Sequence, residues 1–174
     1  MVPVRTAVPD DAPELVRLRK LMFDAMSHAP VAPARPEAAP DSPEGGSDAW
    51  HGVAEALLRK TLADPGSNFG VFVVDDEERP GRLAACAIGT LEQRLPAPGH
   101  PDGRFGFIFN ICTDPDRRRR GYARACTEAL LAWFDARGAT RLDLHATSAG
   151  LELYRSLGFA EHSIALSRSR RHQA

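Results

Sequence analysis

One segment of the chain joins an apolar run, a basic turn and a helical pattern without interruption. The run at residues 105–112 predicts a strand, and the pattern at 122–134 predicts an amphipathic helix. Between them lies DPDRRRRGYA, residues 114–123. The first N–H groups of a helix have no internal partner and attract anions, and Gly121 allows a ligand to approach the backbone closely. The segment therefore predicts a strand–turn–helix site for a pyrophosphate group.

The spacing of this turn differs from two common phosphate-binding motifs. The chain contains neither G-x-x-x-x-G-K-[ST] nor G-x-G-x-x-G, which argues against nucleotide hydrolysis and dinucleotide binding. Its pattern is R-x-x-G-x-A, formed by Arg118, Gly121 and Ala123. This pattern resembles the acetyl-CoA signature of the GNAT superfamily of N-acetyltransferases. The alternative interpretation is a solvated basic turn that only caps a core helix.

A second segment, LELYRSLGF at residues 151–159, strengthens the resemblance. It is similar to the A-x-x-L-Y-x-x-x-G-F segment of many GNAT enzymes, in which the Tyr hydroxyl lies near the acetyl-CoA sulfur. The resemblance implies that Tyr154 is the general acid, because a phenol keeps its proton at neutral pH and can donate it to a forming thiolate. Without the first motif, Tyr154 would be read as a packing residue on a short helix.

The resemblance also implies a binding site for acetyl-CoA. The strand before the turn would pair its backbone with the pantetheine arm at Ile111, Cys112 and Thr113, and the Thr113 amide would polarise the thioester carbonyl. Ile111 and Cys112 would equally serve as core residues. Ser148 offers a further pantetheine contact. The pyrophosphate would bind the turn, whose expected contacts are Arg118, Arg119, Arg120, Gly121, Tyr122 and Ala123.

The sequence offers three candidates for the group that deprotonates the acceptor amine. Asn110 is polar within an apolar strand, so it either faces the acceptor pocket or holds a water there, or points outward from a half-exposed strand. Glu92 ends the preceding strand, where relatives often have a carboxylate, but it is equally a solvated charge. His145 ends a later strand and is equally a structural residue.

Periodicity and turn residues divide the rest of the chain into further elements. Helices are predicted from residue 9 to about 26, at 50–62 and at 149–157, with Gly138 ending the helix after the basic turn. Further strands are predicted at 2–6, 68–74, 82–91, 141–145, 159–161 and 163–168. This order predicts an α/β (α+β) fold with a mixed central β-sheet of about six to seven strands flanked by four helices. The same order is typical of the GNAT fold, whose splayed central strands hold acetyl-CoA.

Length and composition limit the class of protein. At 174 residues the chain predicts one domain at 1–168, in which residues 28–48 form a flexible Pro-rich loop or a lid, and a disordered tail at 169–174. A net charge of -1 gives no electrostatic basis for binding nucleic acid or a membrane. The cysteines are odd in number and indicate reduced core residues of a cytoplasmic protein. The cysteines and histidines show no metal-ligand spacing, so no metal is expected. The sequence also shows no signal-peptide pattern and no membrane-spanning run, as expected of a cytoplasmic protein.

These observations predict an acetyl-CoA-dependent N-acetyltransferase. A neutral primary amine of a small molecule or peptide would attack the bound thioester directly, without a covalent enzyme intermediate. Two alternatives remain: a CoA-binding regulatory protein with little turnover, and a nucleic-acid-binding module that uses the arginines between Arg117 and Arg124. Relatives often form dimers, so a homodimer is also expected.

Overall fold

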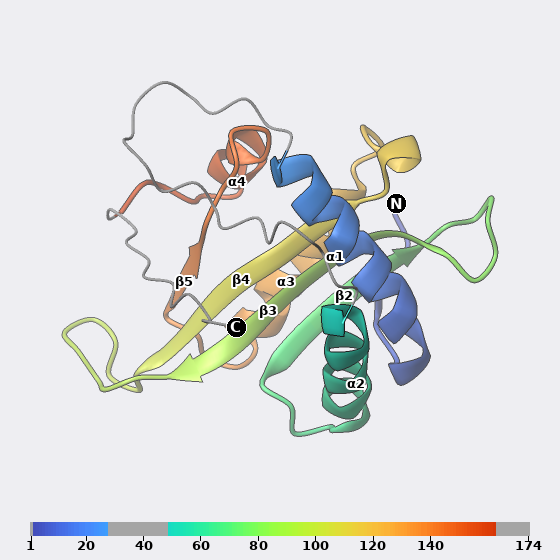
Figure 1. The fold of residues 1–174 in the computed structure, drawn as a ribbon. Coiled ribbons are helices and arrows are strands. Elements are labelled where there is room, and N and C mark those ends of the chain that lie inside the picture. The colour runs from blue at the N-terminus through green and yellow to red at the C-terminus, as the bar shows by residue number, and fades with distance from the viewer. Residues whose placement is uncertain (1, 28–48, 163–174) are drawn as a thin grey trace, which may run out of the picture.

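The structure, a computed structural model, describes residues 2–27 and 49–162 (Figure 1). The predicted Pro-rich loop at 28–48, the predicted strand at 163–168 and the predicted tail at 169–174 lie outside the described residues. Within the described part of the chain, no helix is long and apolar enough to cross a membrane.

A mixed five-stranded sheet forms the centre of the fold (Figure 1). Neighbouring strands are antiparallel except for the last pair, which is parallel because a helix connects them as a crossover. The mixed sheet with flanking helices confirms the predicted fold class, with fewer strands among the described residues than expected. In their order across the sheet, the strands are β1 (Arg5–Thr6), β2 (Phe69–Asp75), β3 (Leu83–Gln93), β4 (Arg104–Thr113) and β5 (Arg141–Leu144).

Two predicted strands differ from the structure. The first, expected at 2–6, is limited to β1 at Arg5–Thr6. The second, expected at 159–161, does not form. The Phe159 N–H donates instead to the Tyr154 carbonyl at 3.0 Å, so this residue closes the turn after the last helix.

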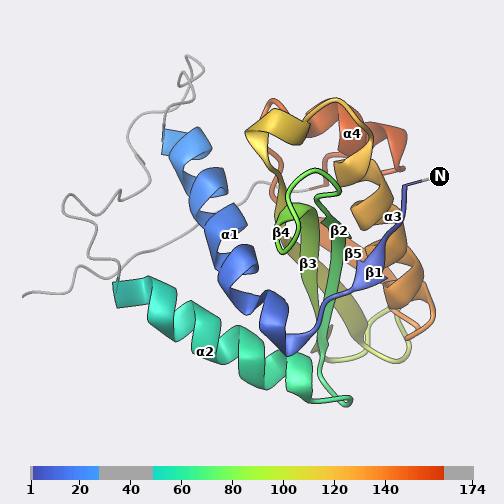
Figure 2. The ribbon, with the colours of Figure 1, turned by 90° about the vertical axis from the view of Figure 1, so that its right-hand side faces the viewer.

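Helices cover both faces of the sheet (Figure 2). α1 and α2 lie on one face and α3 lies on the other, while α4 lies at the end of the sheet where β4 ends and α3 begins (Figures 1 and 2). Single 3-10 turns precede α1 and α3. The bounds of the four helices are α1 (Ala12–Ser27), α2 (Ala49–Ala63), α3 (Tyr122–Asp135) and α4 (Leu151–Ser156).

Two apolar clusters hold the helices against the sheet. On the α1 face, Leu15 packs with Val73, and on the α3 face, Leu130 and Phe134 pack against the strands. Gly106 allows α3 to come close, since a Cβ atom there would lie 2.6 Å from Phe134 Cε1. This packing fixes α3 so that its first turn lies beside the end of β4.

Candidate active site

β4 has a partner strand on both sides over only part of its length. β5 pairs with β4 from Phe105 to Ile108 and ends at Leu144, whereas β4 continues to Thr113. Beyond Ile108, the side of β4 that faces β5 has no partner strand among the described residues. β4 therefore has an unpaired edge in the region where the sequence predicted splayed central strands.

The β3–β4 ladder determines which backbone groups face this open edge. The Asp114 N–H donates to the Ala84 carbonyl at 2.8 Å, in the register of the ladder. In an antiparallel pair, residues that bond to the partner strand alternate with residues that do not. Cys112 therefore directs its N–H and C=O groups toward β3, whereas Ile111 and Thr113 direct theirs to the open edge.

A β-bulge interrupts β4 just before these residues. Ile88 is opposite Asn110, but Gly89 is opposite Ile108, so Phe109 is an additional residue on β4. Bulges bend a strand and redirect its side chains. As a result, both Phe109 and Asn110 contact the α1 face of the molecule.

The turn after β4 contains two residues with positive φ angles, a conformation that residues with a Cβ atom rarely adopt. Asp114 caps the 3-10 turn by accepting a hydrogen bond from the Asp116 N–H at 3.2 Å. Arg119 and Gly121 then adopt φ angles of 64° and 80°. Positive φ is costly for a residue with a Cβ atom, so the conformation of Arg119 is held by its surroundings.

This turn exposes a continuous series of backbone donors. The N–H groups of residues 119–124 have no hydrogen-bond acceptor among the described residues, because α3 begins without a side-chain cap. The next backbone bond runs from the Ala125 N–H to the Gly121 carbonyl at 3.0 Å. A turn with positive φ that leads into a helix N-terminus binds anions well. The space beside Gly121 is open, since a Cβ atom there would meet nothing within 4 Å.

The arginines of this segment have two different roles. Arg117 is buried, and its Nε lies 3.0 Å from Asp76 Oδ1, so it anchors the turn to the β2–β3 hairpin. Arg120 pairs with Glu78 at 3.2 Å. Arg118 and Arg119 are exposed and have no ion pair with any described residue, so their charge is available to a ligand.

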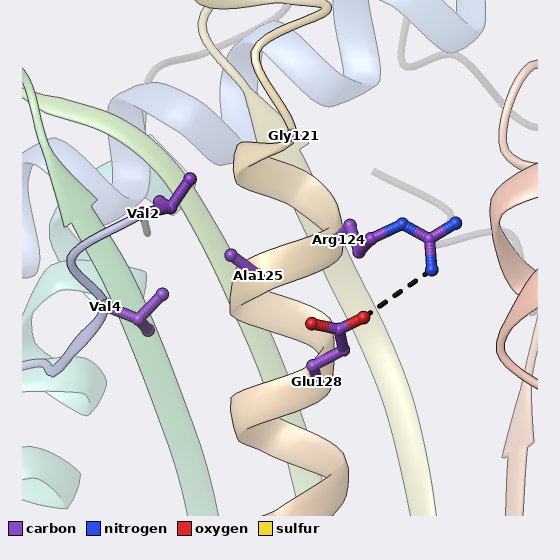
Figure 3. Close-up of a pocket in the computed structure, with 6 residues that line it drawn as sticks. All are labelled: Val2, Val4, Gly121, Arg124, Ala125 and Glu128. Atoms are coloured by element: carbon purple, nitrogen blue, oxygen red, sulfur yellow. Dashed lines mark ion pairs between the residues drawn. The ribbon is translucent and has the colours of Figure 1, made fainter.

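Arg124 connects α3 to α4. Its Nη2 donates to Ser156 Oγ at 2.6 Å, and its Nη1 lies 3.6 Å from Glu128 (Figure 3). A hollow of about 390 Å³ is lined by the first turns of α3, at Gly121, Arg124, Ala125 and Glu128, and by Val2 and Val4 (Figure 3). This hollow is beside the β1 end of the sheet and not at the open edge of β4.

Tyr154 is half-buried on α4. Its ring packs edge-on against Phe159 with centroids 6.1 Å apart, and its hydroxyl makes no hydrogen bond within the described chain. Burial raises the pKa of Tyr154. Because Ser156 ties α4 to Arg124, Tyr154 is held at the end of the sheet where β4 meets the basic turn.

Comparisons with known proteins agree with this geometry. A family model described as the acetyltransferase (GNAT) family matches residues 33–159. The chain belongs to this family.

Individual relatives extend over different shares of the chain. A mycothiol acetyltransferase from Thermobispora bispora is 32% identical over 167 residues, which are 93% of this chain and 52% of the relative. A [ribosomal protein bS18]-alanine N-acetyltransferase from Salmonella typhimurium is 42% identical over 60 residues, 33% of this chain and 40% of the relative. The chain thus spans about half the length of the curated relatives it matches, or less. A crystal structure of a predicted acetyltransferase with acetyl-CoA from Clostridium acetobutylicum shares the fold, with a TM-score of 0.73 at 20% identity over 97% of this chain and 96% of that one.

The structure of this GNAT family member places Asn110 in the interior. The side chain is 1% exposed, which differs from the outward-facing position that the sequence left open. Its Oδ1 accepts from Arg19 Nη1 at 2.9 Å, and its Nδ2 donates to Cys86 Sγ at 3.4 Å. Because Asn110 is fully buried and held by these two bonds, a direct contact with an acceptor amine requires its surroundings to move.

Of the other two candidate bases, Glu92 lies away from the open edge, whereas His145 directly follows Leu144, where the β4–β5 pairing ends. Glu92 is opposite Phe105, eight residues before Thr113, which is about 26 Å along an extended strand. Its Oε2 is 2.7 Å from Arg94 Nη2, as expected of a solvated strand-end charge. His145 is exposed and packs edge-on against the ring of a β4 residue. Ser148 is exposed in the turn before α4.

Sequence reasoning missed a network of charges beneath the basic turn. Asp114 is 3% exposed and lies 2.8 Å from Arg17 of α1 and 3.2 Å from Arg79 of the hairpin. Burial acts to raise the pKa of Asp114, but hydrogen bonds from Arg79 and Arg17 lower it. The partners are far apart in the sequence, so no local pattern indicates these contacts.

Proposed function

We propose that the chain is an acetyl-CoA-dependent N-acetyltransferase that acetylates a primary amine of a small molecule or peptide. The observation that carries this proposal is the open edge of β4, which leads directly into the N–H groups of residues 119–124 that have no acceptor. An extended arm that ends in a pyrophosphate matches this surface. The family membership supports the same activity.

The described residues fit such a ligand in three ways. The backbone groups of Ile111 and Thr113 would pair with the amides of the pantetheine arm like an added strand. The N–H groups of residues 119–124, which have no acceptor among the described residues, would bind the pyrophosphate oxygens. Arg118 and Arg119 would add positive charge beside the pyrophosphate.

In this proposal, the groups that the transfer requires lie at the same end of the sheet. The Thr113 N–H would polarise the carbonyl oxygen of the thioester, so that the negative charge formed on attack is stabilised. The Tyr154 hydroxyl would donate its proton to the sulfur as the C–S bond breaks. Because burial raises the pKa of Tyr154, this phenol is protonated at neutral pH and is able to act as the acid.

The state of Cys112 supports direct transfer to the amine. Burial raises the pKa of this thiol to about 11, so it is not a thiolate at neutral pH. Its backbone belongs to the ladder with β3, as the alternation of bonds shows. An acetylated cysteine intermediate therefore has no support, and the proposal has amine and thioester bound together in a ternary complex.

The arginine cluster gives little support to the nucleic-acid alternative. Arg117 and Arg120 are paired with carboxylates, and Arg124 binds Ser156. Only part of the positive charge that the sequence suggested is therefore unpaired among the described residues. A nucleic-acid surface would need several unpaired cations along the contact.

Calorimetry with acetyl-CoA, followed by thiol-release assays with a panel of amines and peptides, tests the proposal. The expected result is saturable binding, together with thiol release that depends on the amine. Binding without release from any amine would instead identify a regulatory CoA-binding protein. Absence of binding would overturn the proposal altogether.

A further inference from the structure

Arg19 is half-buried where α1 crosses the bulge of β4. Its Nη1 donates to Asn110 Oδ1 at 2.9 Å, and its guanidinium carbon lies 4.7 Å from the ring centroid of Phe23 and 6.0 Å from that of Phe109. Asn110 is fixed in turn by its bond to Cys86 Sγ. The guanidinium is therefore held in a defined position between two aromatic rings.

No described carboxylate balances the charge of Arg19. Every other described arginine that is not exposed has a carboxylate oxygen within 3.8 Å; these are Arg5, Arg17, Arg79, Arg82, Arg117 and Arg141. Burial lowers the pKa of Arg19, in contrast to the raised pKa of Arg17 two residues earlier on α1, where hydrogen bonds and charges from Glu14 and Asp114 outweigh burial. Shielding a charge from water without a counter-charge costs free energy, which an anionic ligand would offset.

The guanidinium also has donors left for a ligand. A guanidinium carries five N–H donors, and Arg19 uses one of them within the described chain. None of its nitrogen atoms is among the fully buried atoms that lack a partner, so the remaining donors are accessible. Two adjacent donors of this kind match the two oxygens of a carboxylate.

We propose that Arg19 binds the carboxylate of the acceptor, and that the acceptor is therefore a small amine with its own carboxylate, such as an amino acid or short peptide. This inference rests on the proposed function. A single planar cation between the rings of Phe23 and Phe109 matches one carboxylate beside an apolar group. Lys20, the next cation on α1, is exposed and already binds Asp24 at 3.1 Å, so it adds no second charge for a phosphate.

The position of Arg19 sets the distance between the two groups of the acceptor. Its partner Asn110 lies one residue before Ile111 and three before Thr113, which corresponds to about 3–10 Å along β4. α1 and α3 lie on opposite faces of the sheet, so the carboxylate would approach from the α1 face and the CoA phosphates from the start of α3 (Figure 2). An amine and a carboxylate within one amino acid or a short peptide span this distance.

Matched acceptors and variants test this role. Amino acids and dipeptides are compared with their C-terminal amides in the thiol-release assay, using wild type, Arg19→Gln, Arg19→Lys and Lys20→Gln. We expect wild type and Lys20→Gln to prefer the free carboxylate about tenfold or more in kcat/KM, a charge-assisted effect. Arg19→Gln loses this preference through KM, and Arg19→Lys restores part of it. The relative rates with amino acids and dipeptides show whether the site accepts the carboxylate of a free amino acid or that of a short peptide.

A binding measurement separates this inference from the proposed function. Calorimetry with N-acetyl-phenylalanine and its amide needs no turnover, and we expect only the carboxylate form to bind wild type and Lys20→Gln. Loss of that binding in Arg19→Gln supports the carboxylate site even where no amine is acetylated. If acids and amides give equal kcat/KM values and equal affinities, or if a preference for acids survives in Arg19→Gln, the role of Arg19 is overturned. Thermal unfolding of each variant identifies a loss that is only structural.

Discussion

Arg117 and Asp76 form a buried ion pair that joins the basic turn to the β2–β3 hairpin. Arg117 Nε lies 3.0 Å and 3.1 Å from the two carboxylate oxygens of Asp76, and the residues are 8% and 3% exposed. Arg79 binds the same carboxylate at 2.6 Å. The first arginine of the basic run therefore positions the turn, and the exposed Arg118 and Arg119 that follow are left for a ligand.

Replacement of Asp76 is expected to destabilise the protein. Asp76→Asn removes the buried counter-charge of Arg117, which keeps only its 3.0 Å pair with the exposed Glu78, and loss of one partner of a buried pair costs about 3 kcal/mol or more. Urea unfolding measures the change. Asp75→Asn is the matched control, because Asp75 is exposed and pairs with Arg5 at the surface, where the expected loss is below about 1 kcal/mol. Equal losses in the two variants would show that the buried pair does not anchor the turn.

The same pair predicts how stability depends on pH. Burial acts to raise the pKa of Asp76, but hydrogen bonds from Arg79 and Arg117 outweigh it and lower the pKa from 3.8 to about 2. Because the folded pKa is the lower one, this stabilisation is complete above the unfolded value of 3.8 and is lost as pH falls through about 2. The difference in unfolding free energy between wild type and Asp76→Asn should be constant above that range and shrink in acid. A difference that grows in acid would show that folding raises the pKa of Asp76 instead of lowering it.

A negative charge introduced at position 121 is expected to weaken CoA binding. Asp and Asn tolerate positive φ similarly and have similar size, so Gly121→Asp and Gly121→Asn differ mainly in charge. We expect Gly121→Asp to bind CoA about tenfold more weakly than Gly121→Asn, because its carboxylate would repel the pyrophosphate. Calorimetry with CoA measures the difference, and pantetheine, which lacks the phosphates, is the control ligand. Equal CoA affinities would place the pyrophosphate elsewhere.

Removal of the Tyr154 hydroxyl is expected to slow turnover while acetyl-CoA affinity changes little. Tyr154→Phe keeps the ring against Phe159 but removes the proton donor, and general acid catalysis contributes about a hundredfold or more. Since the pKa of Tyr154 is raised from 10.0, its loss of activity in alkali should begin above that value in wild type and be absent from the variant. Unchanged turnover in Tyr154→Phe across the pH range would remove Tyr154 from this role.

Replacement of Glu92 is expected to leave catalysis unchanged. Glu92→Gln removes a carboxylate that is exposed, binds Arg94 and lies about 26 Å along the strands from Thr113. Steady-state kinetics with the best amine of the panel measures the effect. A large decrease in kcat with a normal unfolding transition would restore Glu92 as a candidate base.

The local elements of the site could be predicted from the sequence. The strand before the basic turn, the turn at Gly121 and the helix from Tyr122 depend on hydrophobic periodicity and on glycine, which act within a few residues. The prediction failed at 159–161, where a hydrogen bond from Phe159 to Tyr154 replaced strand pairing. A contact of this kind competes with the sheet and leaves no periodic signal.

What the sequence determined by itself was therefore the fold class and the series of backbone donors that begins α3, because both follow from short-range patterns. Only the tertiary structure decided which polar side chains are free to bind a ligand and which are used within the fold. It buried Arg117 on Asp76, enclosed Asn110 beneath Arg19 and left Arg19 without a described carboxylate. These outcomes depend on segments brought together from distant parts of the chain, and the balance between burial and pairing of a charge is fixed only when those segments pack.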